Sequence, residues 1–129
     1  MQNSTNRPES WNAKMIMSGE PLITDEQFEK LLANAPASLE EMETHDPVPV
    51  VKIFLPHMRW ILAWIYPHDR DRAFAVVQFG TERPEAGDVL LSEIVQSRLG
   101  SGKNGVRPER DKYITLDRPI SHYLKVADL

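Results

Sequence analysis

With 129 residues, 41% of them hydrophobic, the chain has the size and composition of one domain with a single core. It contains no cysteine, which excludes disulfides, thiolate metal sites and thiol nucleophiles and favours a cytoplasmic protein. The net charge of −4 is uneven, because residues 1–49 hold three basic and nine acidic residues and residues 50–129 are nearly neutral.

The first twenty residues show no sustained hydrophobic period, so we expect residues 1–20 to be a flexible arm and residues 21–129 to form a single α+β domain. They also lack the basic leader and apolar run of a secretory signal. The longest apolar run, residues 60–66, has the length of a strand, so no association with a membrane is expected.

The first predicted element is a helix over residues 25–35. Thr24 followed by Gln27 is a capping-box pattern, and Ile23 is placed to contact Phe28 as a hydrophobic staple. The acidic stretch that follows, up to the prolines near residue 48, is interpreted as a linker or a short helix.

Two β-branched and aromatic runs then predict a strand over residues 48–55 and a hairpin over residues 59–80. In the first arm of the hairpin, both alternating sets are apolar, which predicts a central strand covered on both sides. Strict alternation places four bulky side chains together on one face: Trp60, Leu62, Trp64 and Tyr66.

The charged middle of the hairpin, residues 67–72, raises a choice between a turn and a site. Pro67, with Asp69 or Asp71, has the chemistry of a solvated turn. The alternative is a metal site or a general base built on His68 beside these carboxylates. The crowding of the groups on one exposed turn favours the turn.

Beyond the hairpin, the pattern predicts a loop over residues 80–87, a short strand over residues 88–91 and a helix that ends at Gly100, with Ser92 as its N-cap. A flexible turn, residues 101–105, and an extended segment follow. The last element is a helix that has Asp117 or Arg118 at its cap and Pro119 in its first turn, and buries three side chains: Ile120, Tyr123 and Leu124. Together these elements predict an α+β fold, a mainly antiparallel sheet of four or five strands packed with the first and last helices.

From residue 22 to the C-terminus, an ordered series of segments runs LITDEQFEKLLAN, PVVKIFLP, RWILAWIYPHDRDRAFAVVQFG, PEAGDVLLSEI, GVRPERDKYI and RPISHYLKVA. In order and spacing, it resembles domain of unknown function family 2958, small proteins of bacterial plasmids, integrative elements and phages. The chain departs from the family in two places. It has the mixed-charge turn HDRDR where the family has an acidic turn, and the bulkier VVQFG where the family has a second strand of small residues. The resemblance implies a fold and a genomic setting, and it carries no catalytic residues across.

Motifs for catalysis or cofactor binding are weak. The four histidines, at positions 45, 57, 68 and 122, have no zinc-binding spacing, and no serine lies in a nucleophile elbow. The GSGKNG stretch lacks the spacing of a phosphate-binding loop. We therefore expect no catalytic residue, no metal and no cofactor.

A mixed-charge surface is the main candidate site. We predict that residues 81–88 and 103–112 meet at the ends of neighbouring strands and form a binding face from Arg83, Glu85, Asp88, Lys103, Arg107 and Arg110. Mixed charge suits a protein partner better than a phosphate backbone, because the carboxylates repel phosphates. A purely structural alternative is an ion pair of Arg110 with a carboxylate such as Glu85.

The expected function is that of a non-enzymatic protein-binding protein of a mobile genetic element, with defence evasion or element maintenance as the roles that its genomic setting suggests. The partner would be a host or element-encoded protein. The alternative is a small nucleic-acid-binding accessory protein, through the basic residues of 98–112, or a metal-dependent enzyme that uses Glu85, Asp88, Arg110 and Asp111.

Overall fold

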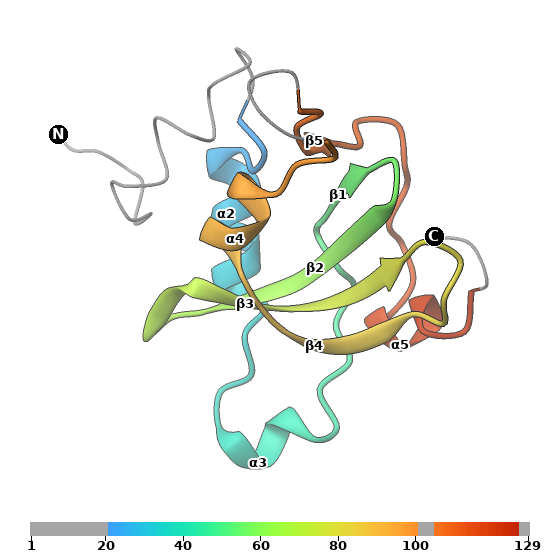
Figure 1. Ribbon diagram of the computed structural model, residues 1–129. Helices are drawn as coiled ribbons and strands as arrows, with labels where there is room; N and C mark the ends of the chain where they lie inside the picture. Colours follow the sequence, from blue (N-terminus) through green and yellow to red (C-terminus); the bar gives the residue numbers. More distant parts are fainter. Residues whose placement is uncertain (1–20, 101–104, 127–129) are drawn as a thin grey trace, which may run out of the picture.

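The computed structural model of the chain describes residues 21–100 and 105–126 (Figure 1). The expected flexible arm, residues 1–20, and most of the expected flexible turn after Gly100 lie outside these residues.

A five-stranded antiparallel sheet forms the body of the molecule, in the spatial order β4-β3-β2-β1-β5. The strands are β1 (Val51–Leu55), β2 (Met58–Tyr66), β3 (Asp69–Phe79), β4 (Glu85–Leu90) and β5 (Glu109–Arg110). This confirms the α+β class and the antiparallel sheet. The strand β2 is central, and its residues from Trp60 to Tyr66 are all buried, as the apolar pattern predicts.

Short helices cover the sheet on both sides. On one face lie α2 (Asp25–Ala33) and α4 (Leu91–Gln96), whose apolar residues join the first core cluster. On the other face, α5 (Ile120–Tyr123) and Met42 of α3 (Leu39–Met42) pack on the second, smaller cluster. Among the described helices, none has the length and apolar character needed to span a membrane.

The start of α2 has the predicted capping box. The Gln27 backbone N–H donates to Thr24 Oγ1 at 3.1 Å, and the Thr24 backbone N–H donates to Gln27 Oε1 at 3.0 Å. Ile23 and Phe28 are both fully buried. The helix ends at Ala33, slightly earlier than predicted, and Asn34 is its C-cap.

The central strand departs from strict alternation at Ala63. Leu62 pairs with Ala75 and Trp64 pairs with Phe74, so Ala63 is an extra residue without a counterpart on β3. Such a bulge moves every following side chain to the other face of the sheet. Trp60 and Leu62 therefore lie in the first cluster, and Trp64 and Tyr66 lie in the second. The prediction that all four share one face is wrong.

The hairpin turn is shorter than predicted. Only residues 67 and 68 form the turn, and β3 begins at Asp69. Asp69 and Arg72 form an ion pair at 3.2 Å. Asp71 accepts hydrogen bonds from the Ser92 backbone N–H at 2.9 Å and from its hydroxyl at 2.7 Å. The predicted cap residue Ser92 is thus inside α4, and Asp71 caps this helix from β3.

The later elements are placed in the predicted order with different bounds. The strand β4 already begins at Glu85, where a loop was predicted, and α4 ends at Gln96 instead of Gly100. The last helix is a single turn whose N-cap is Pro119 instead of the predicted Asp117 or Arg118. Ile120 and Tyr123 are buried, as predicted, but Leu124 is only half-buried.

Candidate functional site

The two segments of the predicted binding face lie on opposite edges of the sheet. Glu85 and Asp88 are in β4, and Arg110 is in β5, with β3, β2 and β1 between them. Arg83 lies just before β4, and Arg107 lies just before β5. Lys103 lies outside the described residues. The single continuous face is therefore a wrong prediction, since β4 and β5 are not neighbouring strands.

On the β5 edge, Arg110 and its neighbour Asp111 make contacts that stabilise the fold. Arg110 Nη1 donates to the Pro21 carbonyl at 2.6 Å, which joins β5 to the segment before α2. Lys52 of β1 pairs with Asp111 at 3.6 Å. An ion pair of Arg110 with Glu85 does not form because three strands separate these residues.

The β4 edge borders a small cavity on the second face of the sheet. Its floor is made by Trp64 and Phe74, which the bulge places side by side with a ring distance of 4.4 Å and an interplanar angle of 8°. Ala86 of β4 lines one side. The cavity has a volume of about 270 Å³. Its other walls are the connector after α3 and the helix α5: Met42, Glu43, Thr44, His45, Asp46, Ile120, Ser121 and Leu124.

At this volume the cavity matches one large side chain and not a drug-sized ligand, whose pockets usually hold about 300 to 1,000 Å³. The bulge is the feature that creates it, since without Ala63 the indole of Trp64 would lie on the other face.

Asn34, at the end of α2, holds the bulge in place. Its side-chain Nδ2 donates to the Ala63 carbonyl at 3.1 Å and to the Val48 carbonyl at 3.0 Å. His45 Nε2 is 2.5 Å from the Asn34 carbonyl oxygen, and the His45 ring lies 5.1 Å from the ring of Trp64. Because Nε2 faces an acceptor, it carries the hydrogen. These contacts attach one cavity wall to its floor.

The opposite wall is attached by Asp46. Its carboxylate accepts from the Ser121 backbone N–H at 2.9 Å and from the Ser121 hydroxyl at 2.5 Å, at the start of α5. The hydroxyl bond is the main reason that the pKa of Asp46 lies below its usual value of 3.8. Asp46 therefore fixes the connector against α5 in its ionised form.

A polar network continues the site beyond Trp64. The Tyr66 hydroxyl donates to Asp88 Oδ1 at 2.7 Å, and Arg72 Nη1 lies 3.9 Å from the other oxygen of Asp88. Burial, together with this hydrogen bond, raises the pKa of Tyr66 to about 12. Asp88 is thus a structural acceptor on the cavity side of β4, and Tyr66 stays protonated at neutral pH.

The indole N–H of Trp64 is buried and makes no hydrogen bond to the described part of the chain. Its neighbour on the same face of the strand is Tyr66, whose ring lies 6.1 Å from the Trp64 ring.

The outer side of β4 is open for pairing. Within the described residues, β4 makes no backbone hydrogen bond outside the sheet ladder, and its far side has no neighbouring strand. Glu85, Ala86 and Asp88 are exposed, and the space beside Gly87 is empty. Such an edge offers unpaired N–H and C=O groups to an incoming strand. By contrast, β5 has only two residues.

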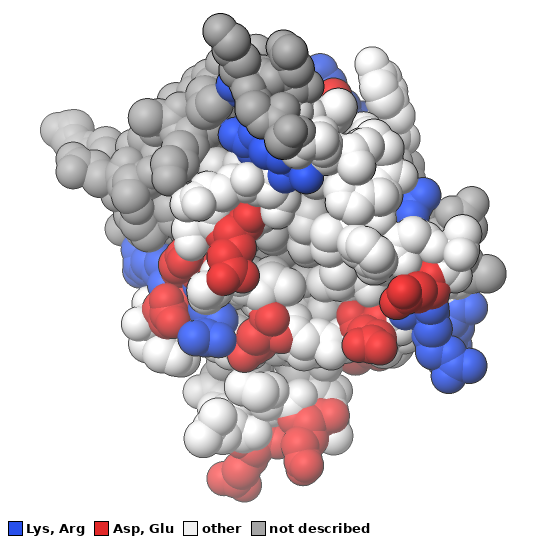
Figure 2. Space-filling model, viewed as in Figure 1, with Lys and Arg blue, Asp and Glu red and all other residues white. Residues whose placement is uncertain are grey.

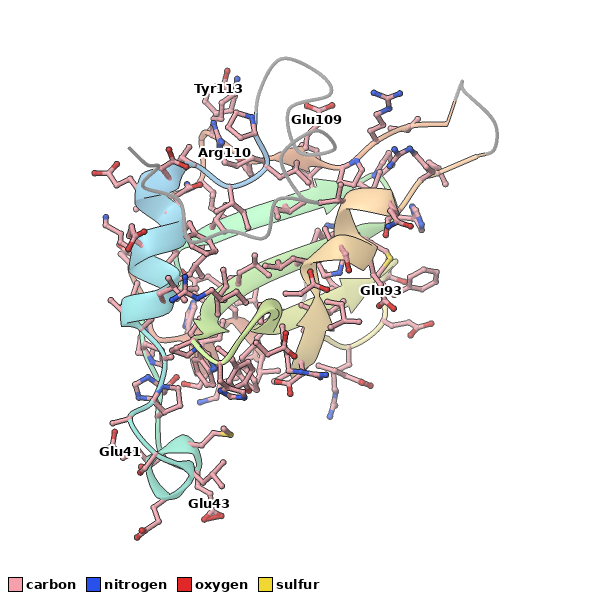
Figure 3. The ribbon with its side chains drawn as sticks, turned by 90° about the vertical axis from the view of Figure 1, so that its left-hand side faces the viewer. Glu41, Glu43, Glu93, Glu109, Arg110 and Tyr113 are labelled. Atoms are coloured by element: carbon pink, nitrogen blue, oxygen red, sulfur yellow. The ribbon has the colours of Figure 1, made fainter. Side chains whose placement is uncertain are left out.

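Charge differs between the two edges. Figure 2 shows acidic side chains over β4, where basic groups lie beside them, and over α3 below it, and a further group of basic side chains towards the β5 end. Figure 3 places Glu41 and Glu43 at the far end of the molecule from Arg110. Carboxylates outnumber cations around the cavity and β4, where the acidic residues are Glu43, Asp46, Glu82, Glu85 and Asp88, and the basic ones are Arg72, Arg83 and Lys125.

The groups on this face do not assemble a metal site. Among the residues that the structure describes, no three His, Asp or Glu side chains come together in a way that holds a metal ion. Glu85 and Asp88, proposed from the sequence as possible ligands, are separated from Arg110 and Asp111 by the width of the sheet.

Arg83, Glu85 and Asp88 were predicted from the sequence as binding residues, whereas the cavity beside β4 was not predicted. Trp64, which forms part of its floor, was predicted only as a member of a central strand covered on both sides. Both alternating sets of the strand are apolar, so no signal in the strand itself marks the bulge.

Comparisons with known proteins identify a family and add no activity. The sequence profile of a family described as "Protein of unknown function (DUF2958)" matches residues 22–129. Neither curated proteins nor solved structures show a match to the chain.

Proposed function

This chain belongs to DUF2958, a family of proteins of unknown function, and we propose that it is a non-enzymatic protein-binding protein whose partner adds an extended strand to β4. The open edge of β4 is the observation that carries the proposal. In strand addition, main-chain hydrogen bonds supply affinity, and pockets beside the edge select alternate side chains of the partner. The cavity of Trp64 and Phe74 lies in the position of such a pocket.

Charge points to the kind of partner. Because carboxylates outnumber cations around β4 and the cavity, a segment rich in Lys and Arg is attracted to this edge. The same carboxylates repel a phosphate backbone, which disfavours nucleic acid at this surface. The basic β5 edge is the place where the nucleic-acid alternative would apply, and there Arg110 is bonded to Pro21.

The biological setting of this proposal is the one expected from the sequence. The partner is a host protein or a protein encoded by the same mobile element, and the binding takes place in the cytoplasm. This part rests on the family resemblance and on the absence of cysteine from the chain.

The test is a selection of linear peptides from a random displayed library on the folded chain, followed by hydrogen exchange of the β4 amides. The expected peptides are basic, and the outward-facing β4 amides exchange more slowly when a selected peptide is bound. Glu85→Lys should weaken binding several-fold, since it reverses a charge at the edge. Glu109→Lys, the matched reversal on β5, should leave binding unchanged.

A second pair of variants tests the backbone directly. In an antiparallel ladder, neighbouring residues point their N–H groups alternately towards and away from the paired strand. One of Ala86→Pro and Gly87→Pro therefore removes an outward N–H and keeps the β3–β4 ladder, while the other breaks it. The variant that keeps the wild-type melting temperature should lose peptide binding.

Two outcomes contradict the proposal. Selected peptides that leave β4 exchange unchanged would place binding elsewhere. Binding of duplex DNA that weakens steeply with salt and is lost in Arg107→Glu would favour the nucleic-acid alternative.

A further inference from the structure

We infer that the cavity beside β4 takes one aromatic side chain of the partner, and that this anchor, set among basic residues, determines which extended segments bind. The inference rests on the proposed strand addition at β4 and deepens it. It assigns a specificity site to the cavity floor of Trp64 and Phe74.

The register of the sheet puts the cavity within reach of an added strand. Ala86 pairs with Val76 of β3, and Asp88 pairs with Phe74, so the side chains of Ala86 and Asp88 point to the second face. A strand added outside β4 lies about 4.8 Å away, and its residue opposite Ala86 points to the same face. That residue enters the cavity.

The size and chemistry of the cavity select an aromatic residue. A volume of about 270 Å³ suits one large side chain. Phe74 is partly exposed and stacked on Trp64, which offers a flat aromatic surface for a second ring. The cavity walls also carry the polar side chains of Glu43 and Thr44, and tyrosine combines a ring with a hydroxyl that can bond to them.

The surroundings of the cavity select basic neighbours. The partner residue two positions from the anchor lies opposite Asp88, on the same face. Glu43 lies on the cavity rim, and Arg72 neutralises only part of this negative charge. The favoured segment therefore has tyrosine at one position and lysine or arginine two positions away.

The probes are two synthetic peptides of nine residues in which Lys and Thr alternate and the central residue is either Tyr or Ala. Binding is measured on the full chain by titration, and the Trp64 indole resonance reports the cavity. The Tyr peptide should bind roughly tenfold more tightly, or better, because the ring is removed from water. It should also shift the Trp64 indole resonance, which the Ala peptide leaves unchanged.

A variant that fills the cavity gives the second readout. Ala86→Leu puts a side chain of the protein itself into the cavity and should abolish the preference for Tyr over Ala. Ala37→Leu, the same change at an exposed alanine before α3, should keep the full preference. Both positions are exposed, so neither change is expected to disturb the core.

The outcomes separate this inference from the proposed function. If both peptides protect the β4 amides and bind equally, strand addition holds and the anchor is overturned. If neither protects the β4 amides, and the library selection yields no peptide that does, the proposed function fails. An unchanged Tyr preference in Ala86→Leu would also overturn the anchor, because the cavity would then be irrelevant to binding.

Discussion

The two halves of β2 have the same apolar composition and serve different parts of the molecule. In the first half, Trp60 and Leu62 pack under α2 and α4 in the larger cluster. In the second half, Trp64 and Tyr66 point to the other face, where a cavity and a polar network remain accessible from the β4 edge. One inserted residue, Ala63, makes the difference. Under the proposed function, the strand supports a core along one stretch and a recognition surface along the next.

The largest expected effect concerns the first half of β2, which packs under α2 and α4. Trp60→Ala should lower the free energy of unfolding by about 3 to 5 kcal/mol, because a buried indole leaves a cavity that the packed face cannot fill. Urea denaturation measures the change. A loss of less than about 1 kcal/mol would show that this face is not packed as described. In folded Trp60→Phe, the Trp64 indole resonance should stay near its wild-type position, since the two rings are on opposite faces.

The next effect tests the link between the halves. Asn34→Ala removes the donor to the Ala63 and Val48 carbonyls and should cost about 1 to 3 kcal/mol. It should also shift the Trp64 indole resonance, because the bulge loses its support. Gln27→Ala, at the other end of α2, should destabilise the chain and leave that resonance unchanged. If the two variants affected Trp64 alike, the role assigned to Asn34 would be wrong.

A smaller effect, the dependence of stability on pH, concerns Tyr66 in the second half of β2. The pKa of Tyr66 is raised from 10.0 to about 12 in the folded chain, so the folded state keeps its proton where the unfolded state releases it. The stabilising contribution is complete below pH 10 and is lost as the pH rises to about 12. Denaturation midpoints at increasing alkaline pH should fall less in Tyr66→Phe than in wild type. An equal fall would contradict the raised pKa of Tyr66 and its hydrogen bond to Asp88.

The smallest effect concerns the tip of the hairpin. Replacing His68 and Asp69 together with Ala should cost about 0 to 1 kcal/mol, because the ion pair that Asp69 makes with Arg72 is half exposed. Asp71→Ala should cost more, about 1 to 2 kcal/mol, since Asp71 caps α4 through Ser92. Thermal melting compares the two. A larger loss from the double replacement would make the tip, and not the cap, the important contact.

Local signals in the sequence were sufficient for much of the fold. The capping box of Thr24 and Gln27 marks the start of α2 because it depends only on residues within one turn. The apolar run of β2 predicts a buried central strand because burial on both faces needs apolar residues at every position. Prolines and glycines separate most of the remaining elements.

The sequence by itself therefore determined the α+β class, the antiparallel hairpin, the order of the elements and the two-sided burial of β2. Only the tertiary structure decided the site. The bulge at Ala63 depends on Asn34, which is 29 residues away, and a strand that is apolar on both faces accepts either register. The placement of β4 and β5 at opposite edges depends on which strands pair, and pairing over long separations leaves no trace in local propensity.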